Sequence, residues 1–227
     1  MRVHVAFTPG EATRVPTGIV VDVLRATSTI VQAVDAGYSA IYCCAEVEEA
    51  QALREEFRDA VLGGERGGNP LPGFDLGNSP LEYLEPRAET LVLTTTNGTR
   101  AVVQAAANCD LVLVGSMLNL RAVAAAARER GEDVEVVCAG LRGGYSEDDA
   151  YCAGRIVALV GGEPTAEAEQ ALELAASFPT AEEAFRTIRR VGETVGEDDL
   201  VWCARESVLS AVPRFAGMRG TAARLIP

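Results

Sequence analysis

Four polar stretches of this sequence combine the side chains that bind or transform small anions. Each supplies carboxylate, guanidinium, hydroxyl or amide groups, often beside glycine, and they lie at residues 22–29, 63–80, 94–100 and 139–149. Carboxylate oxygens are the ligands that Mg²⁺ prefers, and arginine suits phosphate and carboxylate groups. Phosphoryl transfer depends mainly on positioning and on stabilising charge, so it can run on these groups without histidine or lysine. These side chains therefore predict a site that binds a hard divalent cation and a substrate with more than one anionic group.

The first stretch runs out of an expected buried strand into a helix. Asp22 places a carboxylate at the strand end, and Arg25 follows it. Thr27 and Ser28 stand beside free N–H groups of the helix, where a phosphate is favoured. The alternative is structural, with Thr27 or Ser28 as a helix cap and Asp22 paired to Arg25. We favour ligand binding, because the structural alternative leaves an acid buried at the end of a strand.

Residues 63–80 form an unusual segment in which half of the eighteen residues are glycine or proline. A structureless loop of this length is uncommon inside a compact domain, and an ordered one more often binds a ligand. Polar side chains stand between its glycines, among them Glu65, Arg66, Asn78 and Ser79. We therefore expect a functional loop rather than a neutral surface loop.

The third stretch again leads from a strand into a helix. Asn97 and Thr99 offer an amide and a hydroxyl, and Gly98 between them allows the backbone to approach a ligand closely. The Asn-Gly pair is equally typical of turns, so it is weak evidence when taken alone.

The fourth stretch is a strand, a glycine-rich turn that carries Arg142, and the start of a helix. Ser146 as a cap, with acids in the first helical turn, is a sufficient structural explanation for part of it. Three successive acids, residues 147–149, exceed what one cap needs. Asp148 and Asp149 are therefore candidate ligands of a hard divalent cation.

Short apolar runs rich in Val, Ile and Leu alternate with segments of helical length, which predicts strands buried on both faces by crossover helices. The pattern indicates an α/β fold, a three-layer α/β/α sandwich with a mainly parallel (mixed) sheet. Ligands of such sheets bind beyond the carboxyl ends of the strands, where the four stretches would converge. The expected strands are residues 18–23, 40–44, 60–62, 91–95, 111–114 and 134–139, with a half-exposed strand over 3–7 at or near a sheet edge.

The chain is expected to form a single domain over residues 1–227, with its motif-bearing core at about 15–160. From about residue 165 the strand pattern gives way to a helical one, which predicts a helical carboxy-terminal layer over about 165–227. Within that layer, residues 209–215 and 224–226 are the segments that would return short strands to the sheet. Ser79 and Thr180 each begin a capping box, and Gly37 and Gly131 each follow a helical segment.

Composition excludes several classes of mechanism. All twenty cationic residues are arginine and His4 is the only histidine, so Schiff-base and P-loop lysines, a Ser-His-Asp triad and multi-histidine metal sites are ruled out. A formal charge of −13 disfavours nucleic acid as a partner. No stretch reaches the length of a membrane span and no signal-peptide core is visible, so we expect a cytoplasmic protein. A homodimer is expected from base rates alone.

Read together, the four stretches resemble the 2-phosphosulfolactate phosphatase family of coenzyme M biosynthesis. They read DVLRATSTI at 22–30, GGERGGNPLPGFDLGNSP at 63–80, TTNGTRA at 95–101 and AGLRGGYSEDDAYCAG at 139–154. The resemblance covers about residues 15–155, and little aligns beyond residue 161. It implies a three-layer α/β fold and a Mg²⁺-dependent hydrolase that removes phosphate from a small sulfonated or carboxylated 2-hydroxy acid. The implied reaction converts 2-phosphosulfolactate to sulfolactate and phosphate.

The resemblance does not identify the nucleophile. A metal-activated water is preferred, while attack by Asp22 stays open although Leu24 stands where a D-x-D motif would have its second aspartate. The candidate catalytic groups are Asp22, Glu65 and Asp148, and the pool of candidate metal ligands is Asp22, Glu65, Asp148 and Asp149. The candidate substrate contacts are Arg25, Thr27, Ser28, Arg66, Asn78, Ser79, Asn97, Gly98, Thr99 and Arg142.

Two other functions stay open. A small-anion binding or regulatory protein could keep the same pocket on the same fold without turnover. A thiol hydrolase could use Cys138 or Cys152 as its nucleophile. The six cysteines include no C-x-x-C pair, so neither a zinc site nor a disulfide framework is indicated, and we expect reduced, mostly buried thiols.

Overall fold

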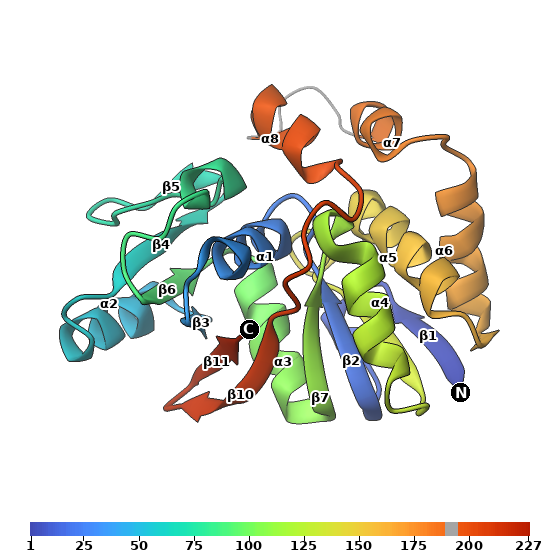
Figure 1. Ribbon diagram of the computed structural model, residues 1–227, viewed down its shortest axis with the longest axis horizontal. Coiled ribbons are helices and arrows are strands. Elements are labelled where there is room, and N and C mark those ends of the chain that lie inside the picture. The colour runs from blue at the N-terminus through green and yellow to red at the C-terminus, as the bar shows by residue number, and fades with distance from the viewer. Residues whose placement is uncertain (189–194) are drawn as a thin grey trace.

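A computed structural model describes residues 1–188 and 195–227 (Figure 1). Within that part of the chain the strands form one eleven-stranded sheet of order β5-β4-β6-β3-β11-β10-β7-β2-β8-β1-β9. The strands are β1 Arg2–Ala6, β2 Val15–Val21, β3 Ala40–Cys44, β4 Val61–Arg66, β5 Asn69–Pro70, β6 Thr90–Thr94, β7 Cys109–Gly115, β8 Val134–Cys138, β9 Glu163–Pro164, β10 Arg214–Arg219 and β11 Ala222–Ile226. Every strand expected before residue 161 is present, with ends shifted by a few residues.

The helices lie between and around the strands. The α-helices are α1 Ala26–Ala36, α2 Val47–Glu56, α3 Gly98–Asn108, α4 Leu120–Arg128, α5 Glu147–Val160, α6 Ala166–Ala176, α7 Ala181–Ile188 and α8 Glu197–Cys203. Short 3₁₀ helices are η1 Pro9–Glu11, η2 Pro80–Tyr83 and η3 Met117–Asn119. Among the described residues, no helix has both the length and the apolar character needed to cross a membrane.

Side chains that alternate along β2 pack into different cores, which shows that helices cover both faces of the sheet. Ile19 and Val21 pack with α4, α5 and α6, whereas Val20 packs with α1 and α3. A third core places Tyr42 and Leu62 against α2. The α/β fold with a large, mostly parallel sheet is therefore confirmed.

The sheet consists of two parallel blocks joined by an antiparallel hairpin. One block contains β7, β2, β8, β1 and β9, and the other contains β4, β6 and β3. The hairpin β10–β11 lies between them, antiparallel to β7 on one side and to β3 on the other. The chain crosses between the blocks in both directions, through α1 and through α3. Each block can therefore contribute strand ends to a shared site.

The hairpin corrects the expectation of a helical layer over residues 165–227. Helices do dominate from α6 to α8, but residues 214–226 form two strands in the middle of the sheet. The strand expected at 209–215 begins only at Arg214, because residues 209–213 run as an extended connection whose Leu209 N–H bonds to the carbonyl of Leu118. Leu225 lies opposite Ile41 of β3 and is fully buried.

Residues 63–80 are more ordered than a structureless loop. Residues 63–66 complete β4, and a tight turn leads into β5, with Glu65 paired to Pro70. Ser79 and Glu82 form the expected capping box, but the helix that follows is the short η2 rather than an α-helix. The glycines allow this compact course: a Cβ on Gly64 would lie 2.1 Å from the carbonyl oxygen of Thr94.

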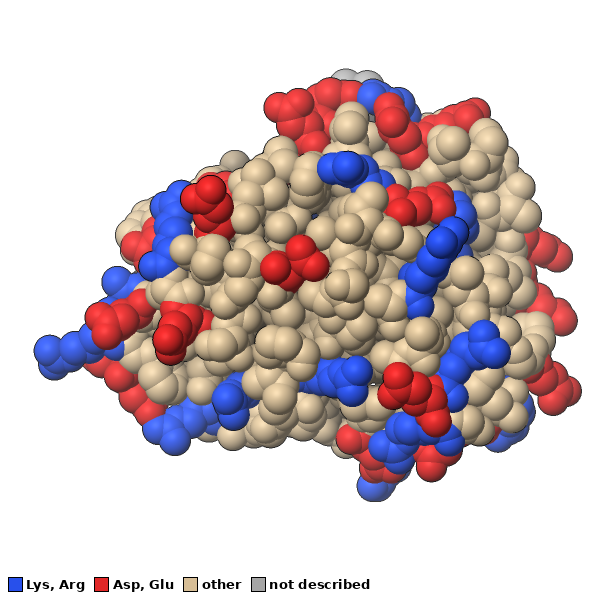
Figure 2. Space-filling view, in the orientation of Figure 1, with Lys and Arg blue, Asp and Glu red and all other residues tan. Residues whose placement is uncertain are grey.

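Charged side chains on the face seen in Figure 2 lie mainly around its periphery, where acidic and basic residues are neighbours. Arg155 pairs with Glu206 at 2.7 Å, for example, with both side chains partly exposed. Such surface pairs contribute little to stability, because water and salt screen them. The pair of Arg25 and Asp199 differs from them because both side chains are buried.

Leu225→Ala is expected to destabilise the protein by about 2–4 kcal/mol, because it removes buried apolar atoms and leaves a cavity at the centre of the sheet. Arg224→Ala, the exposed neighbour on the same strand, is the control and should change stability by less than about 0.5 kcal/mol. Urea unfolding followed by circular dichroism gives both values. Equal stability of the two variants would show that the hairpin lies outside the core.

Candidate functional site

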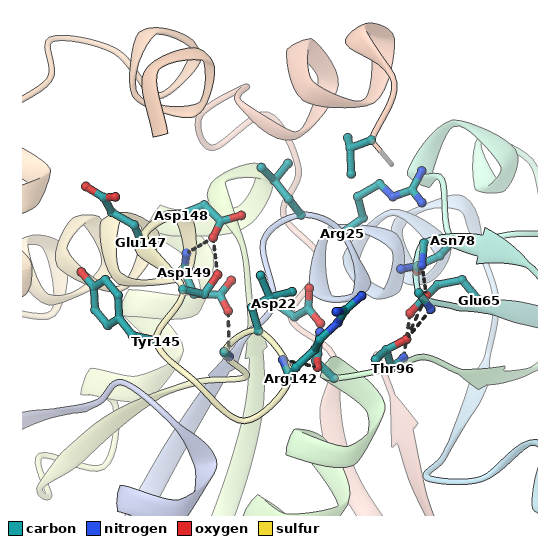
Figure 3. A pocket seen from close by; sticks show the side chains of 18 of the residues that line it. Asp22, Arg25, Glu65, Asn78, Thr96, Arg142, Tyr145, Glu147, Asp148 and Asp149 are labelled. Atoms are coloured by element: carbon teal, nitrogen blue, oxygen red, sulfur yellow. Dashed lines mark hydrogen bonds between the residues drawn. The ribbon is translucent and has the colours of Figure 1, made fainter. Parts of the chain in front are cut away.

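A cavity of about 660 Å³ lies where the carboxyl ends of the two blocks meet (Figure 3). The junctions after β2 and β8 bring Asp22, Arg25, Arg142, Asp148 and Asp149 to its wall. Glu65 comes from the end of β4, Asn78 from the segment between β5 and η2, and Asn97 from the junction after β6. The structure thus brings together eight of the predicted site residues, drawn from all four polar stretches.

Asp22 occupies the centre of the site, between the acids of α5 and Glu65 (Figure 3). It follows β2 directly, and its Oδ1 accepts a hydrogen bond from the N–H of Ala26 at 3.3 Å. Burial is the main cause that raises the pKa of the Asp22 carboxyl to about 7, and the negative charges of Asp148 and Glu65 act in the same direction. Asp22 can therefore exchange a proton near neutral pH.

Gly98 allows α3 to begin against Asp22. A Cβ at this position would lie 2.6 Å from Oδ2 of Asp22 and 2.5 Å from the Cβ of Ala26. Both distances are too short for any side chain, so only glycine permits this approach. Gly98 was predicted to bind substrate, but it does not line the cavity. Its contribution is the space that it leaves for Asp22.

Glu65 is fixed by three hydrogen bonds. Its Oε1 accepts from the N–H of Thr96 at 2.7 Å, and its Oε2 accepts from the hydroxyl of Thr96 at 3.0 Å and the N–H of Gly68 at 2.6 Å. These bonds tie the β4–β5 turn to the junction between β6 and α3. The oxygens of Glu65 are therefore engaged within the protein, and its charge acts on Asp22.

Asp149 is also engaged by the backbone. Its two oxygens accept hydrogen bonds from the N–H of Val23 at 2.8 Å and the N–H of Gly140 at 3.1 Å. Burial, together with the charges of Asp148 and Asp22, raises the pKa of its carboxyl well above the usual range. Asp149 thus joins the junctions after β2 and β8.

Asp148 keeps one oxygen without a hydrogen bond from the described residues. Its Oδ1 accepts from the hydroxyl of Ser146 and from the N–H of Asp149 at 3.1 Å. The structure corrects the expectation that Ser146 caps α5 through its side chain, because that hydroxyl bonds to Asp148 instead.

The four predicted metal ligands do not form a ready cage. No group of three or more His, Cys, Asp or Glu side chains is arranged to hold a metal within residues 1–188 and 195–227. Hydrogen bonds already engage both oxygens of Glu65 and of Asp149. Asp22 and Asp148 are the other two of the four candidate ligands, and Glu147 also lines the cavity.

Two of the three predicted arginines line the cavity. Arg25 follows a cis Leu24–Arg25 peptide bond, and its Nη1 donates to Asp199 at 2.5 Å. Arg142 lies in the glycine-rich turn with φ of 52°, and its N–H donates to Oδ1 of Asn97 at 3.1 Å. The side-chain carbonyl of Asn97 thus sets the position of that turn.

Arg66 does not line the cavity, which corrects the prediction that it contacts substrate. Its guanidinium donates to the carbonyls of Glu65 at 2.8 Å and Ala45 at 3.1 Å, and to the hydroxyl of Thr94 at 2.8 Å. Those bonds direct it away from the site and fasten β4 to the neighbouring strands.

The predicted hydroxyl contacts are likewise structural. Thr27 and Ser28 are fully buried, and their hydroxyls donate to the carbonyls of Asp22 at 2.9 Å and Val23 at 2.8 Å. Thr99 is buried and exchanges hydrogen bonds with Thr95. None of the three lines the cavity, because each hydroxyl is engaged in shaping a strand-to-helix turn.

Asn78 and Ser79 have different surroundings although they are adjacent. Asn78 lines the cavity, and its buried Oδ1 has no hydrogen-bond partner among residues 1–188 and 195–227. Ser79 does not line the cavity, and its hydroxyl donates to Asp199 at 2.5 Å. An unpartnered buried oxygen is costly in a finished core, so Asn78 is poised to accept a hydrogen bond from a ligand or to contact a cation.

Sequence reasoning did not single out three residues that shape the site. Thr96 holds Glu65 and lines the cavity, and Tyr145 lines it with its ring against Phe7. Asp199 holds Arg25 from α8, in a region where no motif was recognised. The only signal for Asp199 was an acidic first helical turn, which is ordinary at a helix start.

The thiols of Cys138 and Cys152 are buried and do not line the cavity. Burial raises the pKa of both well above the usual range, so neither forms the thiolate that a nucleophile needs. The geometry disfavours the thiol hydrolase for this reason.

Asp22→Asn is expected to stabilise the metal-free protein at high pH. The folded carboxyl keeps its proton up to about pH 7, whereas the unfolded one loses it near about pH 3.9, so wild-type stability falls between those values as pH rises. Asparagine mimics the neutral acid, so the variant should gain on the order of 2–4 kcal/mol at pH 8 and little at pH 4. Urea unfolding in EDTA measures this, with the exposed Asp198→Asn as the control. A gain that does not depend on pH would contradict the raised pKa.

Comparison with known proteins places this geometry in a family. A family model described as 2-phosphosulpholactate phosphatase matches residues 6–217. The 2-phosphosulfolactate phosphatase of Methanothermobacter thermautotrophicus is 38% identical over 218 residues, which cover 95% of this chain and 92% of that protein. A probable 2-phosphosulfolactate phosphatase of Thermus thermophilus is 38% identical over 236 residues, which cover 98% of this chain and 98% of that protein. A probable 2-phosphosulfolactate phosphatase of Clostridium acetobutylicum is 36% identical over 215 residues, which cover 88% of this chain and 89% of that protein. This chain therefore belongs to the 2-phosphosulfolactate phosphatase family.

Proposed function

We propose that this protein is a phosphatase that hydrolyses 2-phosphosulfolactate to sulfolactate and inorganic phosphate. Membership of the family supports the reaction class, and one observation of the site carries the mechanism. The carboxyl of Asp22 stands at the centre of the cavity with its pKa raised to about 7. A group with that pKa accepts a proton efficiently at neutral pH.

The proposed substrate has three anionic groups, a phosphate ester, a carboxylate and a sulfonate. Arg25 and Arg142 reach the cavity from different turns and present charged donors for such groups. The starts of α1, α3 and α5 all lie at the cavity, and the positive ends of their helix dipoles favour anions as well. The acids around Asp22 limit how much negative charge the site can accept without a cation.

The oxygen ligands left at the cavity fit Mg²⁺. Asp148, whose Oδ2 accepts no hydrogen bond from the described residues, would hold the ion, since Mg²⁺ is usually bound by one or two carboxylates, with water and substrate phosphate completing its shell. The unpartnered Oδ1 of Asn78 is a further oxygen of the kind that Mg²⁺ prefers. When bound, the ion would supply positive charge that stabilises the phosphoryl oxygens during transfer.

The protein's own groups have separate roles in the proposed reaction. Arg25 and Arg142 bind the anionic groups of the substrate and orient it. Asp22 takes a proton from the attacking water, and the raised pKa lets it do so near pH 7. Asp149 and Glu65 hold the surrounding turns. Burial, together with the charges of Asp148 and Glu65, keeps that pKa high.

Wild-type protein with Mg²⁺ is expected to release phosphate from 2-phosphosulfolactate, and EDTA should abolish the release. Asp22→Asn should lower kcat by about 10²–10⁴-fold, because it removes the proposed base. His4→Gln is the matched control and should keep full activity, since His4 lies on β1 away from the cavity. A malachite-green assay measures the phosphate.

Two comparisons test the substrate and the alternative function. 2-Phospholactate, which lacks the sulfonate, should be hydrolysed with a lower kcat/KM if the sulfonate is bound. Absence of metal-dependent phosphate release from every sulfonated or carboxylated ester would overturn the enzyme proposal. Binding of those esters without turnover would then identify a small-anion binding protein.

A further inference from the structure

Asp199 lies where three distant parts of the chain meet. It belongs to the first turn of α8, and its oxygens accept hydrogen bonds from Nη1 of Arg25 and from the hydroxyl of Ser79, each at 2.5 Å. The side chains of Arg25 and Asp199 are only 10% and 8% exposed. A buried carboxylate with both oxygens engaged by charged or polar donors holds its partners in one geometry.

The neighbouring acids of the same turn behave differently. Asp198 is exposed, and Glu197 is exposed and pairs with Arg186 on α7. Acids at the start of a helix are ordinary when they stay in water, because they complement its dipole. Burial of Asp199 removes water from its carboxylate, and the free energy lost exceeds what the helix dipole returns. Its position is therefore explained by Arg25 and Ser79.

A second contact fixes α8 against the helix that follows Arg25. The indole N–H of Trp202 donates to Oε1 of Gln32 on α1 at 3.1 Å. The guanidinium of Arg205 lies over the Trp202 ring, 4.7 Å from its centroid. Asp199 is thus held at a defined distance from Arg25 by contacts outside the cavity.

Arg25 lines the cavity, and its guanidinium has donors that the described residues leave unused. Among the residues that the structure describes, its guanidinium makes one hydrogen bond, from Nη1 to Asp199. Figure 3 shows that guanidinium on the Asn78 side of the cavity, and Asn78 carries the unpartnered buried Oδ1. Arg25 and Asn78 therefore offer hydrogen-bond donors and an acceptor, respectively, that the described residues leave unused.

We propose that Asp199 is a positioning residue that fixes the Arg25 guanidinium so that its free N–H groups bind one anionic group of the substrate. The inference rests on the proposed function, because the substrate supplies the anion. It assigns the carboxy-terminal helix α8 a part in substrate binding through Arg25. The charge of Asp199 orients the guanidinium, and Ser79 in turn orients Asp199.

Asp199→Asn keeps the size of the side chain but loses its charge. The KM for 2-phosphosulfolactate should rise about 10- to 100-fold, because a loosely held Arg25 meets the substrate in the wrong geometry. The kcat should change much less. Asp198→Asn, one residue away on the same turn, is the matched control and should leave both constants unchanged.

A double-mutant cycle separates positioning from general stability. Arg25→Gln alone should raise KM at least as much as Asp199→Asn, and adding it to Asp199→Asn should cost little more. Independent, additive effects would overturn the proposal. A fall in kcat with unchanged KM, or tighter substrate binding by Asp199→Asn, would overturn it as well.

Ser79→Ala covers the case in which Asp199→Asn does not fold. It removes one of the two bonds to Asp199 and should raise KM by about 3- to 10-fold, since Asp199 then orients Arg25 less well. An unchanged KM for folded Ser79→Ala would contradict the proposal.

Calorimetry with two probes distinguishes failure of this inference from failure of the proposed function. Inorganic phosphate and sulfolactate are titrated separately into the wild type and the Asp199 and Asp198 variants, or Ser79→Ala if Asp199→Asn does not fold. Weaker binding of either probe by the Asp199 variant supports the inference even if the wild type shows no turnover, and it identifies the group that Arg25 binds. Unchanged affinity for both probes overturns the inference, whatever the enzyme assay shows.

Discussion

The contact between the start of α3 and the Asp22 carboxyl is the constraint on which the site depends. It joins the two blocks of the sheet, because Asp22 follows β2 of one block and α3 follows β6 of the other. The glycine at position 98 lets the two approach to a distance that no side chain tolerates. Burial of the carboxyl is the main cause of the raised pKa of Asp22, and the hydrogen bond from the N–H of Gly98 partly offsets it.

Much of the fold could be predicted because its signals are local. Apolar runs of strand length marked every strand before residue 161 except the two-residue β5, to within a few residues, and Gly37 marked the end of α1. The hairpin at residues 214–226 was placed only roughly. Its strands are short and partly exposed, and what makes them strands is pairing with β3 and β7, far away in the sequence. Such long-range pairing leaves little trace in a local pattern.

The candidate site was predictable as a set of stretches and less so as a set of side chains. Asp22, Arg25 and Arg142 line the cavity as expected, whereas Thr27, Ser28 and Arg66 turn their polar groups toward the backbone. A hydroxyl beside a strand end suits either role, and only the arrangement of nearby carbonyls decides between them. The role of Asp199 could not be predicted from the sequence, because its partner, Arg25, lies 174 residues away.

The central hairpin also constrains how the chain can fold. β3 and β7 belong to separate blocks, and only β10 and β11 bridge them within the sheet. Until residues 214–226 are made and paired, both blocks carry an open strand edge, which is a template for wrong pairing and aggregation. Pairing over such sequence distances is intrinsically slow. Pairing of residues 214–226 therefore both completes the sheet and covers the strand edges of β3 and β7 that are exposed until then.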